Sequence, residues 1–462
     1  MQYVNRLLFL TFATFFMSVS VVSGGAVSPV SHDWTYNAYG VIYPGALDVV
    51  GQIAYFGTNY DFGFGYTNFL YAVNITNGNL IWRYNTTLPV NYVSNFTYAN
   101  STYIIAGTGG STSLPSQSHV LALYQQKNVT LWDSANLYSS VQSLGAAESD
   151  FPNNEDVIAG LANGQLVRLW GSNGTKQWER TCAGNITIGR VPNIVKLDNG
   201  SVAVGTFSLD TEQSHIYCFS KDGTPTWNYT TNSYNPLRLI KRFGNLNDVV
   251  AAFADVIDVR NGTTGAEIWL GPFNVTQHIP PYKATQAVTD LLCAEDYAGD
   301  RFPDVVACTT RGFIMIINGK NATLFRGPVQ ISHTSSYIQY MYSYENGVPL
   351  LNKTLTISIE DSSNSNYVYG VNASNLAVEN GLHVPYSAWN LVSISNSSSF
   401  AGDLLFSAAN SVYYISGADV IFSEFPSQII IVVLLGAVGV SETILRRHRQ
   451  ETNQRARLKS NQ

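Results

Sequence analysis

The feature that most constrains the fold of this chain is a repeat of two apolar strands joined by a polar turn, with a large apolar residue closing the second strand. Eight copies begin 40 to 57 residues apart. Their first strands start at Leu70, Val120, Leu166, Ile216, Val256, Phe313, Val368 and Val412. This spacing has room for one four-stranded sheet per copy, which predicts a β-propeller with one blade per copy.

Five copies end in tryptophan, and the weaker copies end in other apolar residues. A four-stranded sheet cannot bury both of its faces alone, so consecutive blades have to pack on one another in a ring. We expect each tryptophan to dock over the next blade. These blade-docking residues are Trp82, Trp132, Trp178, Trp227 and Trp269. The predicted fold is all-β, an eight-bladed β-propeller, with seven blades as the alternative because the seventh copy is poorly formed.

A short segment near the N-terminus resembles the outer strands of these copies. Trp34-Thr-Tyr-Asn is similar to Trp82-Arg-Tyr-Asn and to Trp227-Asn-Tyr-Thr. We therefore hypothesise that this strand completes the blade begun by Val412–Ile415 and closes the ring as a clasp.

The copies resemble the pyrroloquinoline-quinone-type β-propeller repeat. The best matches are Ala72…Gly78…Trp82 and Asp258…Thr264-Gly265…Trp269, and the resemblance covers most of residues 70–422. Quinone dehydrogenases of that family use adjacent cysteines over the cofactor, a calcium site and a catalytic aspartate. This chain has no adjacent cysteine pair, and no catalytic or cofactor-binding residue is assigned. We expect no enzyme activity and no quinone; a quinone-dependent dehydrogenase is the minor alternative.

Both ends of the chain predict export to a membrane. Residues 1–25 have a basic start, an apolar run and small residues, as in a signal peptide; an uncleaved N-terminal anchor is the alternative. Residues 425–445 are long enough to span a bilayer as a helix, and the tail 446–462 is basic, which places it in the cytoplasm. Residues 26–424 are then an extracellular propeller on a single-pass type I membrane protein.

Asn-X-Ser/Thr sequons are more frequent than we expect by chance, and each predicts a glycan on an extracellular surface. For individual sites the alternative is an unused polar turn. The fifteen asparagines are Asn74, Asn85, Asn95, Asn100, Asn128, Asn173, Asn185, Asn199, Asn228, Asn261, Asn274, Asn321, Asn352, Asn372 and Asn396.

The charge of the predicted ectodomain argues against nucleic acid as a partner. The leader and tail hold seven of the 25 basic residues and two of the 31 acidic ones, which leaves 18 against 29, or about −11. Such a surface repels phosphate backbones. The expected partner is an unknown protein or glycan at the cell surface.

An acidic loop resembles the FG-GAP calcium loop of integrin-like propellers. Asp296, Asp300 and Asp304 match three of its ligand positions, whereas Ala298 and Arg301 replace a ligand and the usual glycine. Calcium is therefore one prediction and a structural turn the other. Asp-Val recurs before a strand at Asp156 and Asp248 as well as at Asp304, which indicates that this aspartate caps a blade turn.

The four cysteines of an exported chain suggest disulfides. Cys293 and Cys308 flank the acidic loop almost symmetrically, so we expect them to pair, leaving Cys182 with Cys218. No CxxC motif occurs, so zinc and thioredoxin-type sites are not supported.

These features favour a glycosylated cell-surface binding module without enzyme activity, which recognises a protein, a glycan or an envelope component. A structural or assembly subunit of a membrane complex is a further alternative. Dense sequons and few cysteines favour an archaeal envelope.

Overall fold

In the computed structural model the described residues are 32–61, 65–66, 68–109, 117–183, 194–208, 211–231, 237–244, 246–279, 286–293, 295–331, 334–341, 344–345, 348–349, 354–360, 366–394 and 403–416. The chain divides into two compact units, residues 1–423 and 424–462, and every described residue belongs to the first. The predicted signal peptide, spanning segment and basic tail lie outside the described residues. Within the described part, no helix is long and apolar enough to span a membrane.

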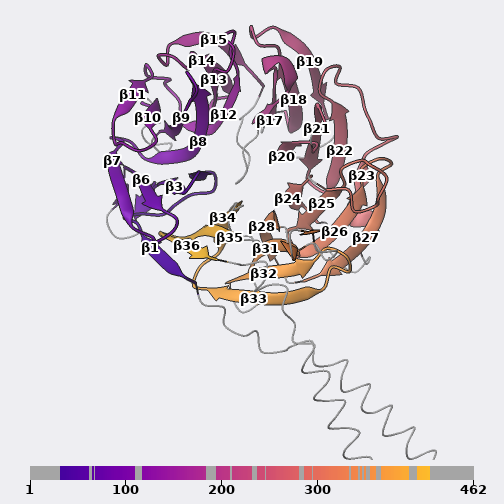
Figure 1. The fold of residues 1–462 in the computed structure, drawn as a ribbon. Coiled ribbons are helices and arrows are strands. Elements are labelled where there is room, and N and C mark those ends of the chain that lie inside the picture. Colours follow the sequence, from indigo (N-terminus) through magenta and orange to yellow (C-terminus); the bar gives the residue numbers. More distant parts are fainter. Residues whose placement is uncertain are drawn as a thin grey trace, which may run out of the picture. The chain divides into compact units, whose positions relative to one another are not determined.

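The described residues form eight four-stranded antiparallel sheets arranged as the blades of a propeller, which confirms the predicted fold (Figure 1). Blade 1 contains β2 (Leu47–Val50), β3 (Ile53–Gly57), β6 (Phe69–Asn74) and β7 (Leu80–Asn85). Blade 2 contains β8 (Val90–Tyr98), β9 (Ser101–Thr108), β10 (Val120–Tyr124) and β11 (Thr130–Asp133). Blade 3 contains β12 (Val141–Glu148), β13 (Glu155–Leu161), β14 (Gln165–Leu169) and β15 (Lys176–Thr181). Blade 4 contains β16 (Ile194–Lys196), β17 (Val202–Ser208), β18 (Gln213–Phe219) and β19 (Pro225–Thr230).

The second half of the ring repeats this order. Blade 5 contains β20 (Leu237–Arg242), β21 (Asp248–Phe253), β22 (Val256–Asn261) and β23 (Phe273–Asn274). Blade 6 contains β24 (Val288–Leu292), β25 (Val305–Thr309), β26 (Phe313–Asn318) and β27 (Thr323–Gln330). Blade 7 contains β28 (Thr334–Met341), β31 (Thr354–Glu360), β32 (Asn366–Asn372) and β33 (Val378–Val384). Blade 8 contains β34 (Ala388–Ile394), β35 (Asp403–Ala408), β36 (Ser411–Ile415) and β1 (Trp34–Asn37).

The ring closes through the N-terminal strand, as the clasp hypothesis predicts. Strand β1 pairs with β36, with Trp34 opposite Tyr414 and Asn37 opposite Ser411. In Figure 1 the indigo strand β1 lies beside the yellow strands β35 and β36. Blade 8 therefore joins the N-terminal strand of the propeller to its last three strands by backbone hydrogen bonds, and this pairing closes the ring.

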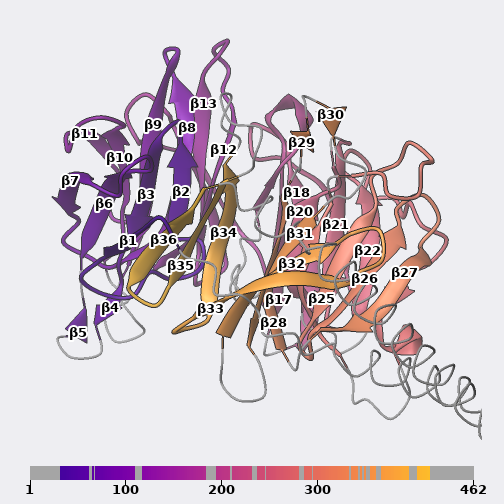
Figure 2. The same cartoon turned by 60° about the horizontal axis from the view of Figure 1, so that its bottom comes forward.

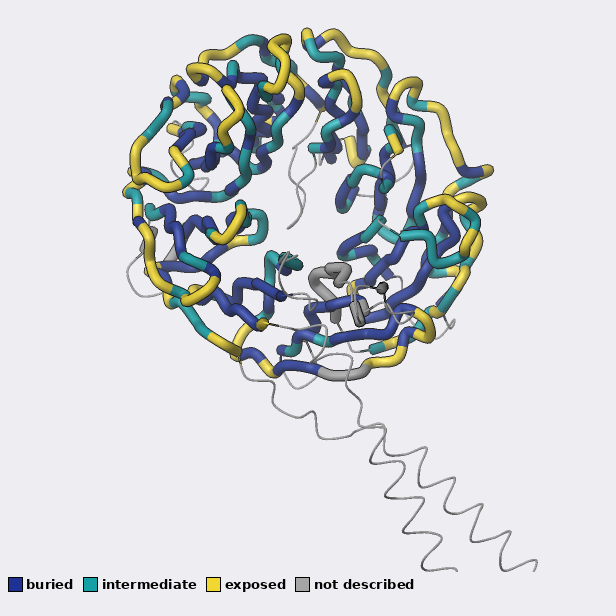
Figure 3. The backbone as a smooth tube through the Cα atoms, viewed as in Figure 1, coloured by how far each residue is buried: buried dark blue, intermediate teal, exposed yellow. Residues whose placement is uncertain are grey.

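Burial follows the position of a strand within its blade. The middle strands β17, β26 and β35 are buried along their whole length, because a neighbouring blade covers each face. The outer strand β27 alternates between exposed and half-buried residues, since one of its faces meets solvent. Figure 3 shows the same gradient, with buried backbone inside the ring and exposed backbone along its outer edge.

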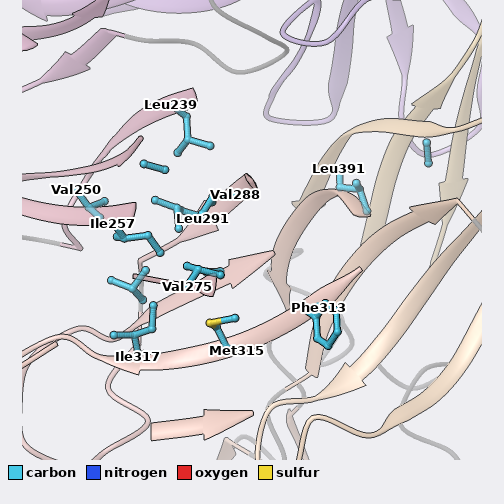
Figure 4. Packing of buried hydrophobic residues seen from close by; sticks show 14 of the residues in the cluster. Leu239, Val250, Ile257, Val275, Val288, Leu291, Phe313, Met315, Ile317 and Leu391 are labelled. Carbon is cyan, nitrogen blue, oxygen red and sulfur yellow. The ribbon is translucent and has the colours of Figure 1, made fainter. Parts of the chain in front are cut away.

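Each seam between consecutive blades contains a buried apolar cluster. One cluster joins β20–β23 to β24–β27, where Ile257, Leu291 and Met315 are fully buried (Figure 4). Separate clusters fill the seams between blades 1 and 2 and between blades 8 and 1. The blades therefore stabilise one another mainly by burying apolar surface.

The antiparallel order gives the ring two distinct ends. Connections from the first to the second strand and from the third to the fourth strand share one end, which we call the turn face. Connections from the second to the third strand and from blade to blade share the other end, which we call the loop face. Two short hairpins mark these ends in Figure 2: β4 (Tyr60–Asp61) with β5 (Gly65–Tyr66) on the loop face, and β29 (Tyr344–Glu345) with β30 (Val348–Pro349) on the turn face. Two short 3-10 helices, η1 (Asp198–Gly200) and η2 (Thr276–His278), lie in connections.

Candidate functional site

The predicted tryptophans all lie at blade seams. In each case the indole Nε1–H donates to a backbone carbonyl in the third-to-fourth-strand turn of the next blade, over 2.6 to 3.2 Å. The pairs are Trp34 with Ile75, Trp82 with Gln125, Trp132 with Gly171, Trp178 with Lys221, Trp227 with Gly262, and Trp269 with Gly319. The docking role is therefore confirmed for all five, and Trp34 is a sixth member.

The indole rings pack on glycines of the adjacent turn. A Cβ atom added to Gly174 would lie 2.4 Å from the Trp132 ring, and one added to Gly265 would lie 2.8 Å from the Trp227 ring. Both glycines have positive φ, which permits the tight turn as well as the close approach of the ring. The repeat therefore needs its glycine and its tryptophan in successive blades.

The recurring Asp-Val aspartates complete this network, as the sequence predicts. Asp304 Oδ1 accepts the Gly319 N–H over 2.8 Å, while the Gly319 carbonyl accepts Trp269 of the previous blade. Asp156 and Asp248 accept the equivalent N–H groups of Gly171 and Gly262. Burial raises the pKa of Asp304, and the hydrogen bonds from backbone N–H groups counter that shift. Each such aspartate holds the turn that the neighbouring tryptophan caps.

The acidic loop is held by hydrogen bonds from its own backbone. Asp296 accepts the N–H groups of Gly299, Asp300 and Arg301. Asp304 Oδ2 accepts those of Tyr297 and Ala298. Asp300 accepts the Phe302 N–H and the Asn318 Nδ2–H, whose hydrogen bond, together with others, lowers its pKa.

Every carboxylate oxygen of the predicted calcium loop therefore faces an N–H donor. Across the described part of the chain, no group of three or more His, Cys, Asp or Glu is placed to hold a metal ion. This donor arrangement does not fit a calcium ion, which needs carboxylate oxygens turned toward one point. It fits the structural-turn prediction.

The predicted disulfides are wrong: all four cysteines lie in the described residues, and neither pair is joined. Cys308 packs in the seam between blades 6 and 7, whereas Cys293 packs against the cluster on the opposite face of the blade 6 sheet. Cys182 packs with Phe219 in the seam between blades 3 and 4. Cys218 precedes Phe219 on β18 and packs on the opposite side of the sheet, in the seam between blades 4 and 5. A β-strand sends successive side chains to opposite faces, and the sheets therefore separate both pairs. Burial raises the pKa of Cys182 to about 12.

The sequons divide by exposure. Seven asparagines are exposed: Asn85, Asn100, Asn128, Asn173, Asn199, Asn228 and Asn321. Four are half-buried, namely Asn74, Asn95, Asn261 and Asn274, and Asn372 is buried. Asn185, Asn352 and Asn396 lie outside the described residues.

Turn chemistry explains part of the sequon pattern. At six sequons the asparagine Oδ1 accepts the backbone N–H of the Ser or Thr two residues later, which is an Asx turn. The six are Asn74, Asn85, Asn173, Asn261, Asn321 and Asn372. At two sequons the asparagine Nδ2, the atom to which a glycan is attached, already donates a hydrogen bond: Asn95 donates to Asp48 and Asn261 donates to Asp248. These bonds oppose modification at the two sites. Part of the high number of sequons is therefore explained by turn formation and does not require glycans.

Exposed tyrosines lie on the loop face. Four of them lie in blade-to-blade connections: Tyr39 and Tyr43 between blades 8 and 1, Tyr138 between blades 2 and 3, and Tyr386 between blades 7 and 8. Their exposed fractions are 64%, 41%, 74% and 57%. Exposed aromatic side chains on rigid loops are a common basis of recognition.

Comparison with known proteins places this geometry among propellers. A family model described as "Outer membrane protein assembly factor BamB" matches residues 45–208. Blades 1 to 3 are similar to the BamB family. The matched residues end at β17, inside blade 4. No curated protein matches the chain.

Solved structures confirm the fold. BamB from Moraxella catarrhalis is 14% identical, with a TM-score of 0.54, over 83% of this chain and 99% of BamB. The computationally designed Ika8 protein is 12% identical, with a TM-score of 0.55, over 85% and 100%. Sqt1 of Saccharomyces cerevisiae is 10% identical, with a TM-score of 0.57, over 84% and 98%. At these identities the likeness is one of fold.

Two groups of residues in this geometry were not predicted from the sequence. The first is the set of glycines that link aspartate to tryptophan, Gly171, Gly262 and Gly319. Their signal is an Asp-Val pair followed 14 or 15 residues later by glycine. The second is the exposed tyrosines: tyrosine is abundant throughout the chain, so only their position in blade-to-blade connections distinguishes them.

Proposed function

We propose that the chain is a non-enzymatic interaction module of a cell surface, which binds a protein partner and contributes to an assembly. The observation that carries the proposal is the ring itself: its blades are locked by tryptophans on the turn face, while its loop face exposes tyrosines. A rigid frame with exposed loops suits recognition rather than turnover. The similarity of blades 1 to 3 to an assembly-factor family supports the same role.

The proposed location rests on the two ends of the chain. A leader over residues 1–25 would export the propeller, and the apolar run 425–445 with its basic tail would anchor it with the propeller outside. Glycans on exposed sequons would add to this surface. An assembly held at a membrane by such a helix is consistent with binding a neighbouring envelope protein.

The test is chemical crosslinking of the full-length chain on intact cells, followed by mass spectrometry. We expect one or a few protein neighbours at near-stoichiometric yield, attached to the propeller. A chain that crosslinks to nothing, or only at the background level of an unrelated surface protein, would contradict the proposal. The purified protein is also mixed with pyrroloquinoline quinone, Ca²⁺ and a dye acceptor; dye reduction would favour the dehydrogenase alternative instead.

A further inference from the structure

The buried and half-buried lysines and arginines of the described residues have partners within the protein, with one exception. Those that form an ion pair or donate to a backbone carbonyl are Arg168, Arg180, Lys196, Lys221, Lys241, Arg242, Arg260 and Arg326. The exception is Arg238, which is half-buried. Among the described residues, none hydrogen-bonds to its guanidinium, pairs with it or stacks on it.

The Arg238 guanidinium lies at the boundary between protein and solvent. Its Nε atom is buried, whereas its two Nη atoms keep access to solvent. Taking a charge partly out of water without a partner costs stability, and the other half-buried cations avoid that cost. An external anion that reaches the Nη atoms would supply the missing partner.

Arg238 lies where the chain enters blade 5 on the loop face. It is the second residue of β20, the inner strand of the blade (Figure 1). The register of β20 with β21 shifts between Leu237 and Leu239, so Arg238 is the extra residue of a β-bulge. Leu237 and Leu239 are fully buried in the seams on the two sides of blade 5. The bulge therefore presents Arg238 from a rigid backbone, as bulges beside binding sites do.

The same bulge in other blades has a structural role that Arg238 does not share. At the bulge of β8, Asn91 Nδ2–H donates to Ser140 Oγ at the entry of blade 3 over 2.8 Å. At the bulge of β34, Asn390 Nδ2–H donates to the Tyr43 carbonyl at the entry of blade 1 over 3.0 Å. Arg238 makes no such bond to any described residue of blade 6. Holding two blades together therefore does not explain this arginine.

The chemistry of the site favours a carboxylate. A guanidinium presents paired N–H donors in one plane, which match the two oxygens of a carboxylate. The other cations of β20, Lys241 and Arg242, lie at its turn-face end and are already paired with Asp290 and Asp198. A single unpaired charge suits a monoanion, whereas phosphate groups are usually held by several donors.

We propose that Arg238 is the binding residue of a carboxylate site at the loop-face end of blade 5. The carboxylate comes either from an acidic side chain or C-terminus of a protein partner, or from a small organic acid. With the protein source the site rests on the proposed function and names one of its contacts; with the small acid it stands apart from that function.

The first experiment tests whether the charge is unpaired. Arg238→Met in the purified full-length protein keeps a long apolar side chain and removes the charge, so the melting temperature in chloride buffer should rise by about 1–3 °C. Arg311→Met is the matched control, because Arg311 is an exposed arginine of the loop face in the connection between β25 and β26. It should leave the melting temperature unchanged. A lower melting temperature for Arg238→Met would assign Arg238 a structural role and overturn the site.

The second experiment identifies the carboxylate. Arg238→Lys places a primary amine at the site, and a water-soluble carbodiimide added to intact cells joins this amine to a carboxylate in contact with it as an amide. Mass spectrometry of the peptide that contains residue 238 then reads the attached group. We expect about tenfold more adduct than at Arg311→Lys, as for a charge-assisted hydrogen bond that holds the carboxylate in place. A melting temperature close to that of the parent protein shows that the variant is folded.

The outcomes separate the site from the proposed function. An Asp, Glu or C-terminal peptide of another protein identifies the protein source, and a small-acid adduct identifies the other source. An adduct to a carboxylate of the same chain, an equal yield at the two positions, or no adduct at residue 238 would overturn the site. If the full-length parent chain still crosslinks to protein neighbours in that case, the interaction module stands without it. If the small-acid adduct forms and no protein neighbour is captured, the site stands and the proposed function is contradicted.

Discussion

The docking tryptophans at one end of the propeller differ in exposure from the tyrosines of the blade-to-blade connections at the other end. On the turn face, tryptophans such as Trp269 are buried and donate their only polar hydrogen to the next blade. On the loop face, tyrosines such as Tyr386 keep more than half of their surface in solvent. Under the proposed function, stability and recognition are therefore placed at opposite ends of one ring. Substitutions at one end should therefore leave the property of the other end unchanged.

The largest effect is expected from Trp269→Ala, which tests whether the turn-face tryptophans stabilise the ring. It removes a buried indole from the seam between blades 5 and 6 and leaves a cavity, so the free energy of unfolding should fall by about 3–5 kcal/mol. Urea denaturation of the purified protein measures this. The neighbouring Leu270→Ala removes a fully exposed side chain and should change stability by less than about 0.5 kcal/mol. Equal effects of the two would show that the indole does not lock the seam.

A smaller loss is expected from Gly319→Ala, which disturbs the link between Asp304 and Trp269. The added Cβ would lie 1.8 Å from the Pro303 carbonyl oxygen, so backbone has to move. We expect a loss of about 1–3 kcal/mol, as for overpacked sites. Gly145→Ala in β12 is the matched control: like Gly319 it lacks a positive φ, but an added Cβ would lie 3.5 Å from the Ile194 side chain, which is an ordinary contact. If Gly145→Ala is the more damaging of the two, close packing at Gly319 is not the reason for its glycine.

On the loop face, Tyr386→Ala should leave the free energy of unfolding within about 0.5 kcal/mol of the parent protein while weakening partner capture. Its ring is 57% exposed, so little buried surface is lost. Tyr138→Ala, on the loop face but between blades 2 and 3, should change neither property. Denaturation curves and crosslinking yield are measured on the same preparations. A fall in stability for Tyr386→Ala that matches Trp269→Ala would erase the distinction between the two ends.

Glycan mapping by peptide mass spectrometry sharpens the comparison without mutation. We expect modification at exposed turn-face asparagines such as Asn128 and Asn173, and none at Asn95, Asn261 or Asn372. The last three are buried or use Nδ2 as a hydrogen-bond donor. Full occupancy at Asn261 would require its bond to Asp248 to be broken.

The smallest effect is expected from calcium. Millimolar Ca²⁺, followed by a chelator, should leave the melting temperature unchanged, because the carboxylates of Asp296 and Asp304 accept backbone N–H groups. Magnesium serves as the ionic-strength control. A rise in melting temperature with Ca²⁺ alone would reinstate the metal site.

The sequence predicts the repeating part of this molecule well and the unique parts poorly. Strands, tryptophan docking, the Asp-Val caps and the β1 clasp follow from patterns that recur, so each copy supports the reading of the others. The cysteine pairing fails because closeness in sequence says nothing about which face of a strand Cys293 or Cys308 occupies. The calcium ligands fail in the structure because the same carboxylates can bind N–H groups of their own loop. The exposure of the loop-face tyrosines depends on the blade-to-blade connections that carry them, and no local pattern encodes how those connections lie.

The most direct test compares two variants side by side: Tyr43→Ala/Tyr386→Ala on the loop face and Trp269→Phe on the turn face. For each we measure the denaturation midpoint and the crosslinking yield from a photo-reactive phenylalanine analogue at Tyr39. We expect the tyrosine variant to melt like the parent protein and to lose the partner, whereas the tryptophan variant should be less stable and should still capture the partner when folded. A tyrosine variant that retains the partner, or a tryptophan variant that loses it while folded, would contradict the separation of the two faces.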